Sequence, residues 1–348
     1  MKKLKFGIIG AGGIADRRTL PGMLKAKNAE IVAVMEILPE RAEELRVKYG
    51  AKYAYTTAEE VVQNPEVEAV YIASPVVCHA AQAKLAADYG KHVLLEKPIA
   101  MTIQEGEELL AYCKAKGVKV AAGFMMRFGA HVMNMKKAVS EGKIGQVVSG
   151  YSQFTLWLPK EAGNWRLSKA KSGGGALMDM GVHCIDLMEY ILSTKVKTVA
   201  GFNDTVVFDY DVEDSSTIIL RMENGAQCVV QTNFNIPDAA AKWRLEFFGT
   251  RGRLMGDTII GQNDGGSLNA LFLEDVAGYD AVQDHAEDKG IEMEGEFGDM
   301  YTREVESFAE SVLENKPLVV PAEDALRVQK VIAAAYESTE KNTMIEIK

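Results

Sequence analysis

Short apolar runs alternate with amphipathic segments through the first third of the chain. The apolar runs predict strands at residues 5–10, 31–35, 69–73, 91–95 and 118–122. The amphipathic segments predict helices at residues 41–50, 58–64, 79–89 and 103–116, each ending beside a glycine or proline. A further helical segment after residue 15 is expected to break at Pro21. Such alternation is typical of a doubly wound parallel sheet, so we predict an α/β fold here.

The pattern becomes strand-rich after Gly123. The expected elements are a helix within 125–145, a strand at 146–158, a helix after the glycines 173–175, and hairpins at 216–234 and 243–257. Two amphipathic helices, 301–313 and 322–340, follow and could pack back on the first domain. We therefore predict two domains, 1–123 and 124–348.

Apolar and polar residues alternate along both predicted hairpins, so their sheet has two usable faces. One face is expected to cover helices of the same domain. The other is expected to meet a second copy of the chain, which predicts a homodimer or homotetramer.

Composition narrows the class of protein. A chain of 348 residues is too long for one compact core and suits two domains. A net charge of -10 argues against nucleic-acid binding, and no apolar run approaches the ~20 residues that span a membrane. The N-terminus lacks the features of a signal peptide, and the four cysteines form no CxxC pair. These observations predict a cytoplasmic protein with reduced thiols.

Most of the net charge lies in one segment. Residues 274–299 contain ten acidic residues and one lysine. A solvated loop or hairpin insertion is the favoured interpretation, and an acidic docking surface is the alternative.

The first predicted strand leads into a glycine turn. Residues 10–15 read GAGGIA, which matches G-x-G-x-x-A, and an acid, Glu36, ends the next strand. Gly10 permits the turn, Gly12 lets the backbone approach a pyrophosphate, and the helix after Gly13 and Ile14 presents free N–H groups to phosphates. The sequence therefore predicts a dinucleotide site.

Glu36 also bears on the choice of cofactor. Its carboxylate can accept hydrogen bonds from both hydroxyls of the adenosine ribose and would repel a 2′-phosphate. Arg41 could accommodate such a phosphate, or it could be a surface residue beside Glu44. We predict NAD as the cofactor in preference to NADP.

Two other predicted strands end in unusual residues. Ser74-Pro75 follows one strand, and Glu96-Lys97-Pro98 follows the next. Ligands of parallel sheets sit at the carboxyl ends of the strands, so these residues are expected to face the cofactor crevice.

The helix after the three glycines carries Asp179 and His183, whose spacing puts both on one helical face. A metal site that adds Cys184 and Asp186 is conceivable. It is disfavoured because Cys184 faces differently from His183 and no second histidine is near, so no metal is predicted.

The chain resembles the Gfo/Idh/MocA family of oxidoreductases. The resemblance rests on GIIGAGGIA at the start, EKP at 96–98, RF at 127–128, and WR…GGGALMDMGVHCIDL within 165–187. It covers nearly the whole chain. It implies an N-terminal Rossmann domain, a C-terminal α/β domain with a large, mostly antiparallel sheet, a nicotinamide cofactor, and oligomers built through that sheet.

The resemblance also implies roles for single residues. Lys97, Asp179 and His183 match the catalytic residues of the family. Histidine, with an ordinary pKa of about 6.5, suits exchange of the hydroxyl proton, and a lysine can stabilise developing alkoxide charge. Taken singly, each could instead be structural: a surface lysine, a helix-capping aspartate and a core histidine.

Other positions are implied to line the site. Arg127, Trp165 and Arg166 lie where the family lines its substrate pocket, although Trp165 could equally be a core residue. His79 matches a position near the cofactor, with helix packing as its alternative role, and Glu96 would balance the charge of Lys97 or help seat the nicotinamide ribose.

The predicted function is that of an NAD-dependent dehydrogenase acting on a secondary hydroxyl of a sugar, cyclitol or sugar derivative. One alternative is an NAD-dependent glycoside-cleaving enzyme that uses transient ring oxidation and elimination. The other is a non-enzymatic regulator that binds NAD and a sugar.

Overall fold

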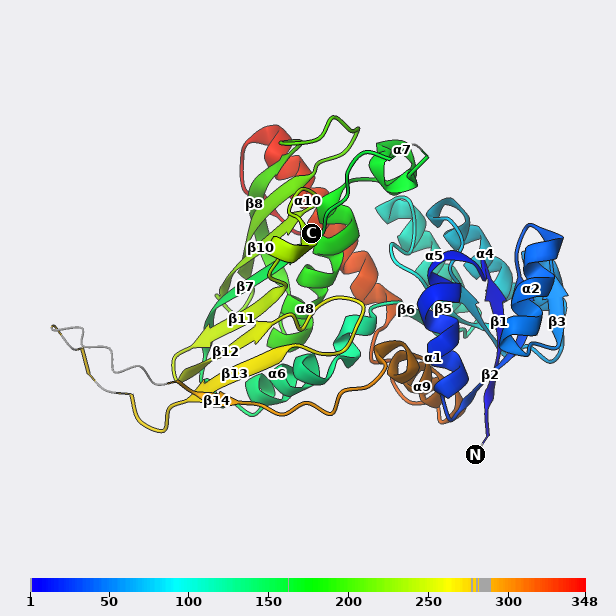
Figure 1. Ribbon diagram of the computed structural model, residues 1–348, viewed down its shortest axis with the longest axis horizontal. Coiled ribbons are helices and arrows are strands. Elements are labelled where there is room, and N and C mark those ends of the chain that lie inside the picture. Colours follow the sequence, from blue (N-terminus) through cyan, green and yellow to red (C-terminus); the bar gives the residue numbers. More distant parts are fainter. Residues whose placement is uncertain (1, 162, 277, 280, 282–288) are drawn as a thin grey trace. The chain divides into compact units, whose positions relative to one another are not determined.

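The computed structural model describes residues 2–161, 163–276, 278–279, 281 and 289–348. The chain divides into two compact units (Figure 1). The first combines Met1–Met125 with Asp299–Gln329, and the second combines Met126–Gly298 with Lys330–Lys348. This division differs from the predicted domains 1–123 and 124–348 mainly in residues 299–329.

The first unit contains a six-stranded parallel sheet in the order β3-β2-β1-β4-β5-β6. Its strands are β1 (Leu4–Ile9), β2 (Ala29–Met35), β3 (Tyr53–Tyr55), β4 (Ala69–Ile72), β5 (His92–Leu95) and β6 (Val120–Ala122). Its helices are α1 (Leu20–Lys25), α2 (Pro39–Tyr49), α3 (Ala58–Gln63), α4 (Val76–Asp88), α5 (Ile103–Ala115) and α9 (Met300–Leu313). The predicted doubly wound fold is confirmed, and the short strand β3 was not predicted.

The helix α9 explains why residues 299–329 belong to the first unit. Val305 and Phe308 of this helix are buried in the same core as Phe6 of β1. The rings of Phe6 and Phe308 lie 5.9 Å apart. The polar face of α9 carries glutamates, and burying its apolar face on the sheet removes that area from water.

The expected break at Pro21 is wrong. A π-helical turn at Ala15–Thr19 runs directly into α1, and Pro21 lies within the first two residues of α1. A proline is tolerated in a first helical turn because its missing N–H has no necessary partner there, and the change from π to α hydrogen bonding falls at this point.

The second unit is built on a nine-stranded sheet in the order β14-β13-β12-β11-β7-β10-β9-β8-β15. All its neighbouring strands are antiparallel except β7 and β10. The strands are β7 (Val147–Thr155), β8 (Val196–Asp204), β9 (Ser215–Met222), β10 (Gln227–Asn233), β11 (Arg244–Gly249), β12 (Gly252–Asp257), β13 (Ser267–Phe272), β14 (Ile291–Glu292) and β15 (Ile345–Glu346). The mostly antiparallel sheet and both hairpins are confirmed, whereas β8 and β13–β15 were not predicted.

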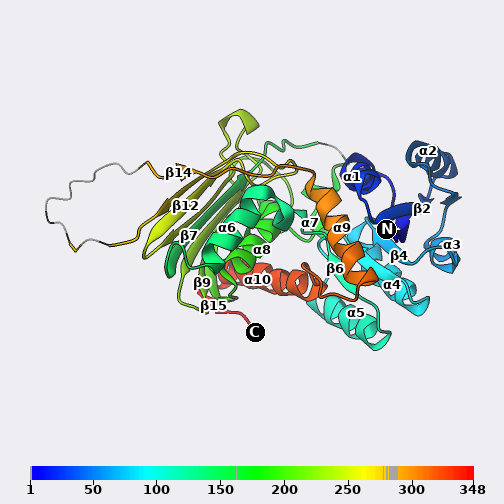
Figure 2. The same ribbon diagram turned by 90° about the horizontal axis from the view of Figure 1, so that it is seen from below.

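One face of this sheet is covered by helices of its own unit. Figure 2 shows α6 (Ala130–Ser140) and α8 (Val182–Leu192) on that face. Strand β9 shows the alternation that results, since Ile218 and Leu220 are fully buried while Ile219 between them is 55% exposed. The long helix α10 (Ala322–Lys341) contributes its second half to this unit.

Part of the acid-rich segment 274–299 can be placed. Its flanks form a hairpin-like insertion, because β13 pairs with β14 through Ala270 and Ile291. Residues 277, 280 and 282–288 lie outside the described residues, so the choice between a solvated insertion and a docking surface stays open.

Two further observations concern membrane-spanning helices and the cysteines. Within the described ranges, none of the helices is long and apolar enough to span a bilayer. The four cysteines, all of which are described, are unpaired, and three of them are buried.

The open face of the second sheet is where the predicted oligomer would form. Ile219, Tyr151 and Met255 lie on it in one row, since the residues that pair across the strands share a face. Phe202 on β8 is 69% exposed beside them.

We predict that light scattering at micromolar concentration will show a dimer or tetramer for the wild type and a smaller mass for Ile219→Lys. The control Val47→Lys, at an exposed site on α2, should leave the mass unchanged. A monomeric wild type would contradict the prediction.

Candidate active site

The glycine turn after β1 favours glycine for two reasons, which are a left-handed backbone at Gly10 and Gly13 and close neighbours at Gly10 and Gly12. Gly10 has a φ of 77°, and a Cβ there would lie 2.7 Å from the backbone nitrogen of Ser74. A Cβ on Gly12 would lie 2.7 Å from Oε1 of Glu36. Gly13 has a φ of 57°, and Ile14 is the N-cap residue of the π-helical turn Ala15–Thr19. The turn therefore offers a bare backbone next to the ends of β2 and β4, which is the cradle that a pyrophosphate requires.

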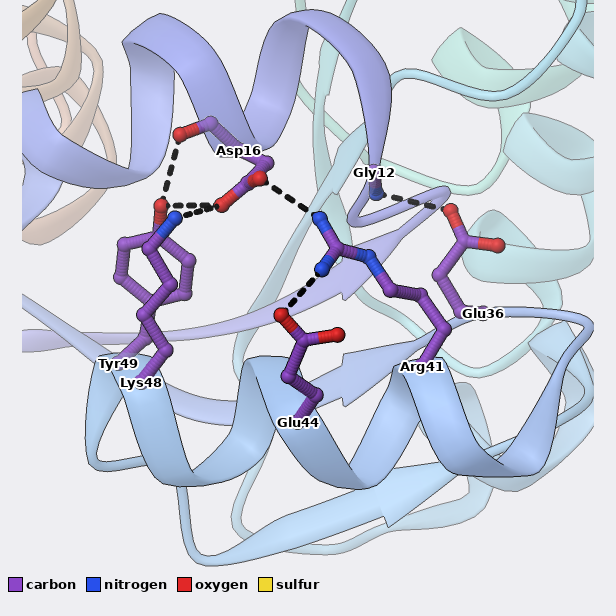
Figure 3. Close-up of polar contacts among 7 residues, drawn as sticks. All are labelled: Gly12, Asp16, Glu36, Arg41, Glu44, Lys48 and Tyr49. Carbon is purple, nitrogen blue, oxygen red and sulfur yellow. Dashed lines mark hydrogen bonds and ion pairs between the residues drawn. The ribbon is translucent and has the colours of Figure 1, made fainter.

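Glu36 lies at the end of β2 and reaches this turn. Its Oε1 accepts the N–H of Gly12 at 2.8 Å (Figure 3). Its Oε2 accepts the N–H of Ile37 at 3.2 Å. The carboxylate is thus beside the glycine turn, as a ribose-binding acid in a dinucleotide site would be.

Arg41 is engaged by two carboxylates of the first unit. Its Nη2 donates to Oδ2 of Asp16 at 2.7 Å and its Nη1 to Oε1 of Glu44 at 2.5 Å (Figure 3). Asp16 also accepts from Lys48 and Tyr49. Burial alone would raise the pKa of Asp16, but these hydrogen bonds and the charges of Lys48 and Arg41 lower it overall. Asp16 therefore holds Arg41 as an ionised partner.

His79 connects two of the turns at the strand ends. It is buried in α4, with Nε2 2.8 Å from the carbonyl oxygen of Ser74 and Nδ1 2.9 Å from that of Pro98. Burial lowers the pKa of His79, although the two carbonyls oppose this effect. Pro75 precedes α4 as its N-cap residue. His79 thus ties the turn after β4 to the turn after β5.

The turn after β5 carries Glu96, Lys97 and Pro98, and the Lys97–Pro98 peptide is cis. Glu96 accepts a hydrogen bond from the hydroxyl of Tyr71 at 2.5 Å, and that hydroxyl lies 2.9 Å from Oγ1 of Thr19. Burial raises the pKa of Glu96, against the opposing effects of the Tyr71 hydrogen bond and the charge of Lys97. Both charged residues thus lie directly after β5, at the carboxyl end of the strand, and that they face a cofactor stays a prediction.

Asp179 and His183 lie at the start of one helical segment in the second unit. Asp179 belongs to a π-helical turn, Leu177–Gly181, and His183 to the first turn of α8. His183 is buried, whereas Asp179 is partly exposed. Such π-turns occur often at functional sites, and each of the two π-turns among the described residues lies beside a predicted site.

Two predicted substrate residues lie next to Asp179. Nε of Arg166 donates to Oδ2 of Asp179 at 3.2 Å, and the guanidinium lies over the ring of Trp165 at 4.7 Å. Trp165 is 43% exposed, so the alternative of a core tryptophan is wrong. The structure therefore brings an aromatic face, a cation and an acid together on one surface.

Arg127 has a different environment from the one expected of a substrate contact. It is 3% exposed, and its Nε and Nη2 donate to both carboxylate oxygens of Asp186. Its guanidinium also lies 4.8 Å from the centre of the Tyr190 ring. Arg127 therefore anchors α8, and a contact with substrate stays a prediction that these partners do not support.

Sequence reasoning missed Glu213. Its buried carboxylate accepts the N–H groups of Gly175 and Leu177, at 2.9 and 3.0 Å, and the hydroxyl of Tyr336 at 2.9 Å. Glycine is needed at position 175 for this close approach, since a Cβ on Gly175 would lie 1.9 Å from the carbonyl oxygen of Glu213. Glu213 thus satisfies the N–H groups at the start of the helix that bears Asp179. The three glycines at 173–175 are the sequence feature that could have indicated a close contact at this helix start.

The predicted site residues are shared between the two units. The first holds the glycine turn, Glu36, His79 and Lys97, and the second holds Trp165, Arg166, Asp179 and His183. Joint action of Lys97 with Asp179 and His183 is therefore still a prediction. Among the residues that the structure describes, no group of three or more His, Cys, Asp or Glu side chains is arranged to hold a metal ion.

A parallel sheet with a tight glycine turn and an acid at the end of its second strand defines a dinucleotide-binding protein. Comparison with known proteins gives the class. Residues 4–124 match the oxidoreductase family with an NAD-binding Rossmann fold, and residues 132–255 match the GFO/IDH/MocA C-terminal domain. The chain belongs to the Gfo/Idh/MocA family of oxidoreductases, whose named relatives include sugar dehydrogenases and reductases.

Two curated relatives and one solved structure illustrate the similarity. The 1,5-anhydro-D-fructose reductase of Ensifer adhaerens is 30% identical over 76% of this chain and 79% of its own length. The D-xylose 1-dehydrogenase (NADP(+)) 2 of Haloferax volcanii is 29% identical over 99% of this chain and all of its own. The structure of levoglucosan dehydrogenase with NADH and levoglucosan has a TM-score of 0.86 at 24% identity, and covers 99% of this chain and 100% of that one.

The role of Glu213 leads to a stability prediction. Glu213→Ala leaves two buried N–H groups and a buried hydroxyl without their acceptor, so it should lower the free energy of unfolding by about 1–3 kcal/mol for each group left unsatisfied. Urea unfolding measures the loss. Glu223→Ala, at an exposed position in the turn after β9, is the matched control and should change little. A Glu213→Ala protein as stable as the wild type would show that the carboxylate does not hold this helix.

Proposed function

We propose that the protein is an NAD-dependent dehydrogenase that transfers hydride between nicotinamide and a secondary hydroxyl of a sugar, cyclitol or sugar derivative. The observation that carries the proposal is the position of Lys97 at the same strand edge as the glycine turn and Glu36. The names of the relatives, an anhydrofructose reductase, a xylose dehydrogenase and a levoglucosan dehydrogenase, support a carbohydrate substrate.

The bound dinucleotide would supply the hydride acceptor. In this proposal His183 takes the hydroxyl proton, and Lys97 donates a hydrogen bond to the same oxygen, stabilising its developing negative charge. Asp179 holds that hydroxyl or a neighbouring one. Oxidation would thus yield a ketone, the reduced cofactor and one proton.

The surface beside Asp179 suits a polyhydroxylated ring. The half-exposed face of Trp165 can cover the apolar face of a sugar, while Arg166 and Asp179 supply a donor and an acceptor for its hydroxyls. Arg166 is positioned between these two groups, so it would fix the orientation of the ring.

The preference for NAD follows from the carboxylate of Glu36 and from the two carboxylates that already bind Arg41. Glu36 brings negative charge to the region where a 2′-phosphate would bind, and Arg41 is paired with Asp16 and Glu44. A 2′-phosphate would have to draw Arg41 away from both partners. Relatives include an NADP-dependent enzyme, so the preference belongs to the residues of this chain and not to the family.

The cofactor preference predicts the effect of one substitution. Wild-type protein should bind NAD more tightly than NADP, and Glu36→Ser should narrow or reverse the difference because it removes the repelling carboxylate. Fluorescence titration with both cofactors measures this. Glu40→Ser, an exposed position in the first turn of α2, is the control and should keep the preference. Tighter binding of NADP by the wild type would contradict the proposal.

The division of roles predicts non-additive losses. Sugars and polyols are first screened for NADH absorbance, with mass spectrometry of products to detect glycoside cleavage without net reduction. On the substrate found, Lys97→Ala and His183→Ala should each lower single-turnover rates by about 10²–10⁴-fold. The double variant should be hardly slower than the poorer single one, because both residues act on one oxygen.

A matched control and a binding measurement accompany this test. Lys114→Ala, at an exposed site on α5, should keep the wild-type rate, and His183→Ala should leave NAD affinity nearly unchanged. Near wild-type turnover in Lys97→Ala or His183→Ala, with the fold intact, would overturn the assignment of these residues.

A further inference from the structure

Glu304 of α9 is a buried acid that the proposed chemistry does not use. It is 2% exposed, and within the described part of the chain neither of its carboxyl oxygens has a hydrogen-bond partner. An ionised carboxylate in such a place loses its hydration without compensation, which is among the most unfavourable arrangements in a protein. A neutral carboxylic acid avoids most of this penalty.

The helix that carries Glu304 packs closely against α1 of the same unit. Gly22 of α1 allows this approach, since a Cβ there would lie 2.9 Å from Cβ of Tyr301. Thr302 donates its hydroxyl to the carbonyl oxygen of Gly22 at 2.9 Å. The side chain of Glu304 is therefore fixed in the interior of the first unit.

The charged and titratable groups around Glu304 come from several elements. Tyr71 of β4, Glu96 after β5 and Tyr301 at the start of α9 interact electrostatically with Glu304. Lys97 acts on Glu96, and Arg18 of the π-turn and Asp299 act on Tyr301. Strand β1, against which α9 also packs, presents the apolar ring of Phe6. Burial raises the pKa of Glu304 well above its ordinary value, and the charge of Glu96 raises it further.

The two carboxyl groups differ in the donors that reach them. Glu96 accepts from the hydroxyl of Tyr71 and lies beside the charge of Lys97, both of which favour its ionised form. Two neighbouring carboxylates in a region of low dielectric constant do not both ionise readily. The proton stays on the carboxyl group that has fewer hydrogen-bond donors and less positive charge beside it. That one is Glu304.

We propose that Glu304 is kept protonated in the folded protein, so that the pair of Glu304 and Glu96 carries one negative charge, located on Glu96 beside Lys97. Glu304 is then a positioning residue that acts on the lysine through Glu96. This second part rests on the proposed role of Lys97, whereas the protonation of Glu304 does not.

Protonation of Glu304 in the folded protein predicts in which direction stability changes with pH. The unfolded chain releases the Glu304 proton near its ordinary pKa of 4.5, while the folded protein retains it to higher pH. Above pH 4.5 folding therefore takes up a proton, and this contribution to stability is lost as pH rises toward the folded pKa. Glu304→Gln carries a neutral side chain of the same shape at every pH, so its free energy of unfolding does not decrease in this way as pH rises.

Urea unfolding between pH 5 and pH 9 tests the protonation. The folding equilibrium constant of Glu304→Gln, divided by that of the wild type, should rise by up to about tenfold per pH unit until the folded pKa is reached. Glu59→Gln, an exposed position in the first turn of α3, is the control and should give a ratio that does not vary with pH. A ratio for Glu304→Gln that is flat, or that falls with rising pH, would overturn the proposal.

A second measurement covers the case in which the variant does not fold. Infrared spectra of the wild type in D₂O at pH 7 should contain the carbonyl band of a protonated carboxylic acid. Absence of this band would contradict the protonation directly.

The positioning role has its own readout. With a substrate in hand, turnover of the wild type should fall on the alkaline side as Glu304 loses its proton, and Glu304→Gln should retain its rate there. Identical pH profiles for the two proteins would show that Glu304 is only structural. The unfolding and infrared results require no substrate, so a failure of the dehydrogenase proposal would be recognised separately.

Discussion

In a parallel sheet, the carboxyl ends of all the strands meet at one edge, and the whole dinucleotide site of this protein depends on that constraint. Residues far apart in the sequence become neighbours there. The hydrogen bond from Gly12 to Glu36 joins the ends of β1 and β2, and His79 joins the turns after β4 and β5. The Tyr71–Glu96 hydrogen bond joins β4 to β5 at the same level.

Acidic side chains of the first unit differ in the number of hydrogen-bond donors that they receive. Asp16 receives donors from three side chains and is stabilised as an anion, which fixes Arg41. Glu304 receives none from the described residues, so it is stable in its interior position as a neutral acid. Glu96 lies between these extremes, with one tyrosine donor and a neighbouring lysine. The charge at the strand edge is therefore set by which acids receive donors.

Much of the fold could be predicted because its signals are local. Glycine turns, caps and periodicity marked most elements of the first sheet and both hairpins. Strands β3 and β14 contain only three and two residues, too few for a period to be recognised. The assignment of α9 to the first unit could not be predicted with certainty, because it depends on contacts such as Phe6 with Phe308 across the length of the chain.

The candidate site could also be predicted only where local sequence motifs mark its residues. Spacing and motif indicated Glu36 and the acids and bases at the strand ends, since their neighbours in sequence carry the signal. Arg127 and Glu213 depend on partners 59 and 36–38 residues away, and no local pattern shows that one forms a buried ion pair while the other caps a helix. Motif resemblance places a residue near a site, but only the three-dimensional contacts distinguish a substrate ligand from a support.

The position of NAD in a crystal structure of the complex tests the central claim most directly. The account predicts the adenosine ribose hydroxyls within hydrogen-bond distance of the Glu36 carboxylate, the pyrophosphate over the backbone of Gly12, and the nicotinamide ring beside Lys97. The same structure would show whether Asp179 and His183 face that ring. A dinucleotide bound away from the carboxyl ends of β1, β2 and β5, or a nicotinamide ring remote from Lys97, would contradict the account.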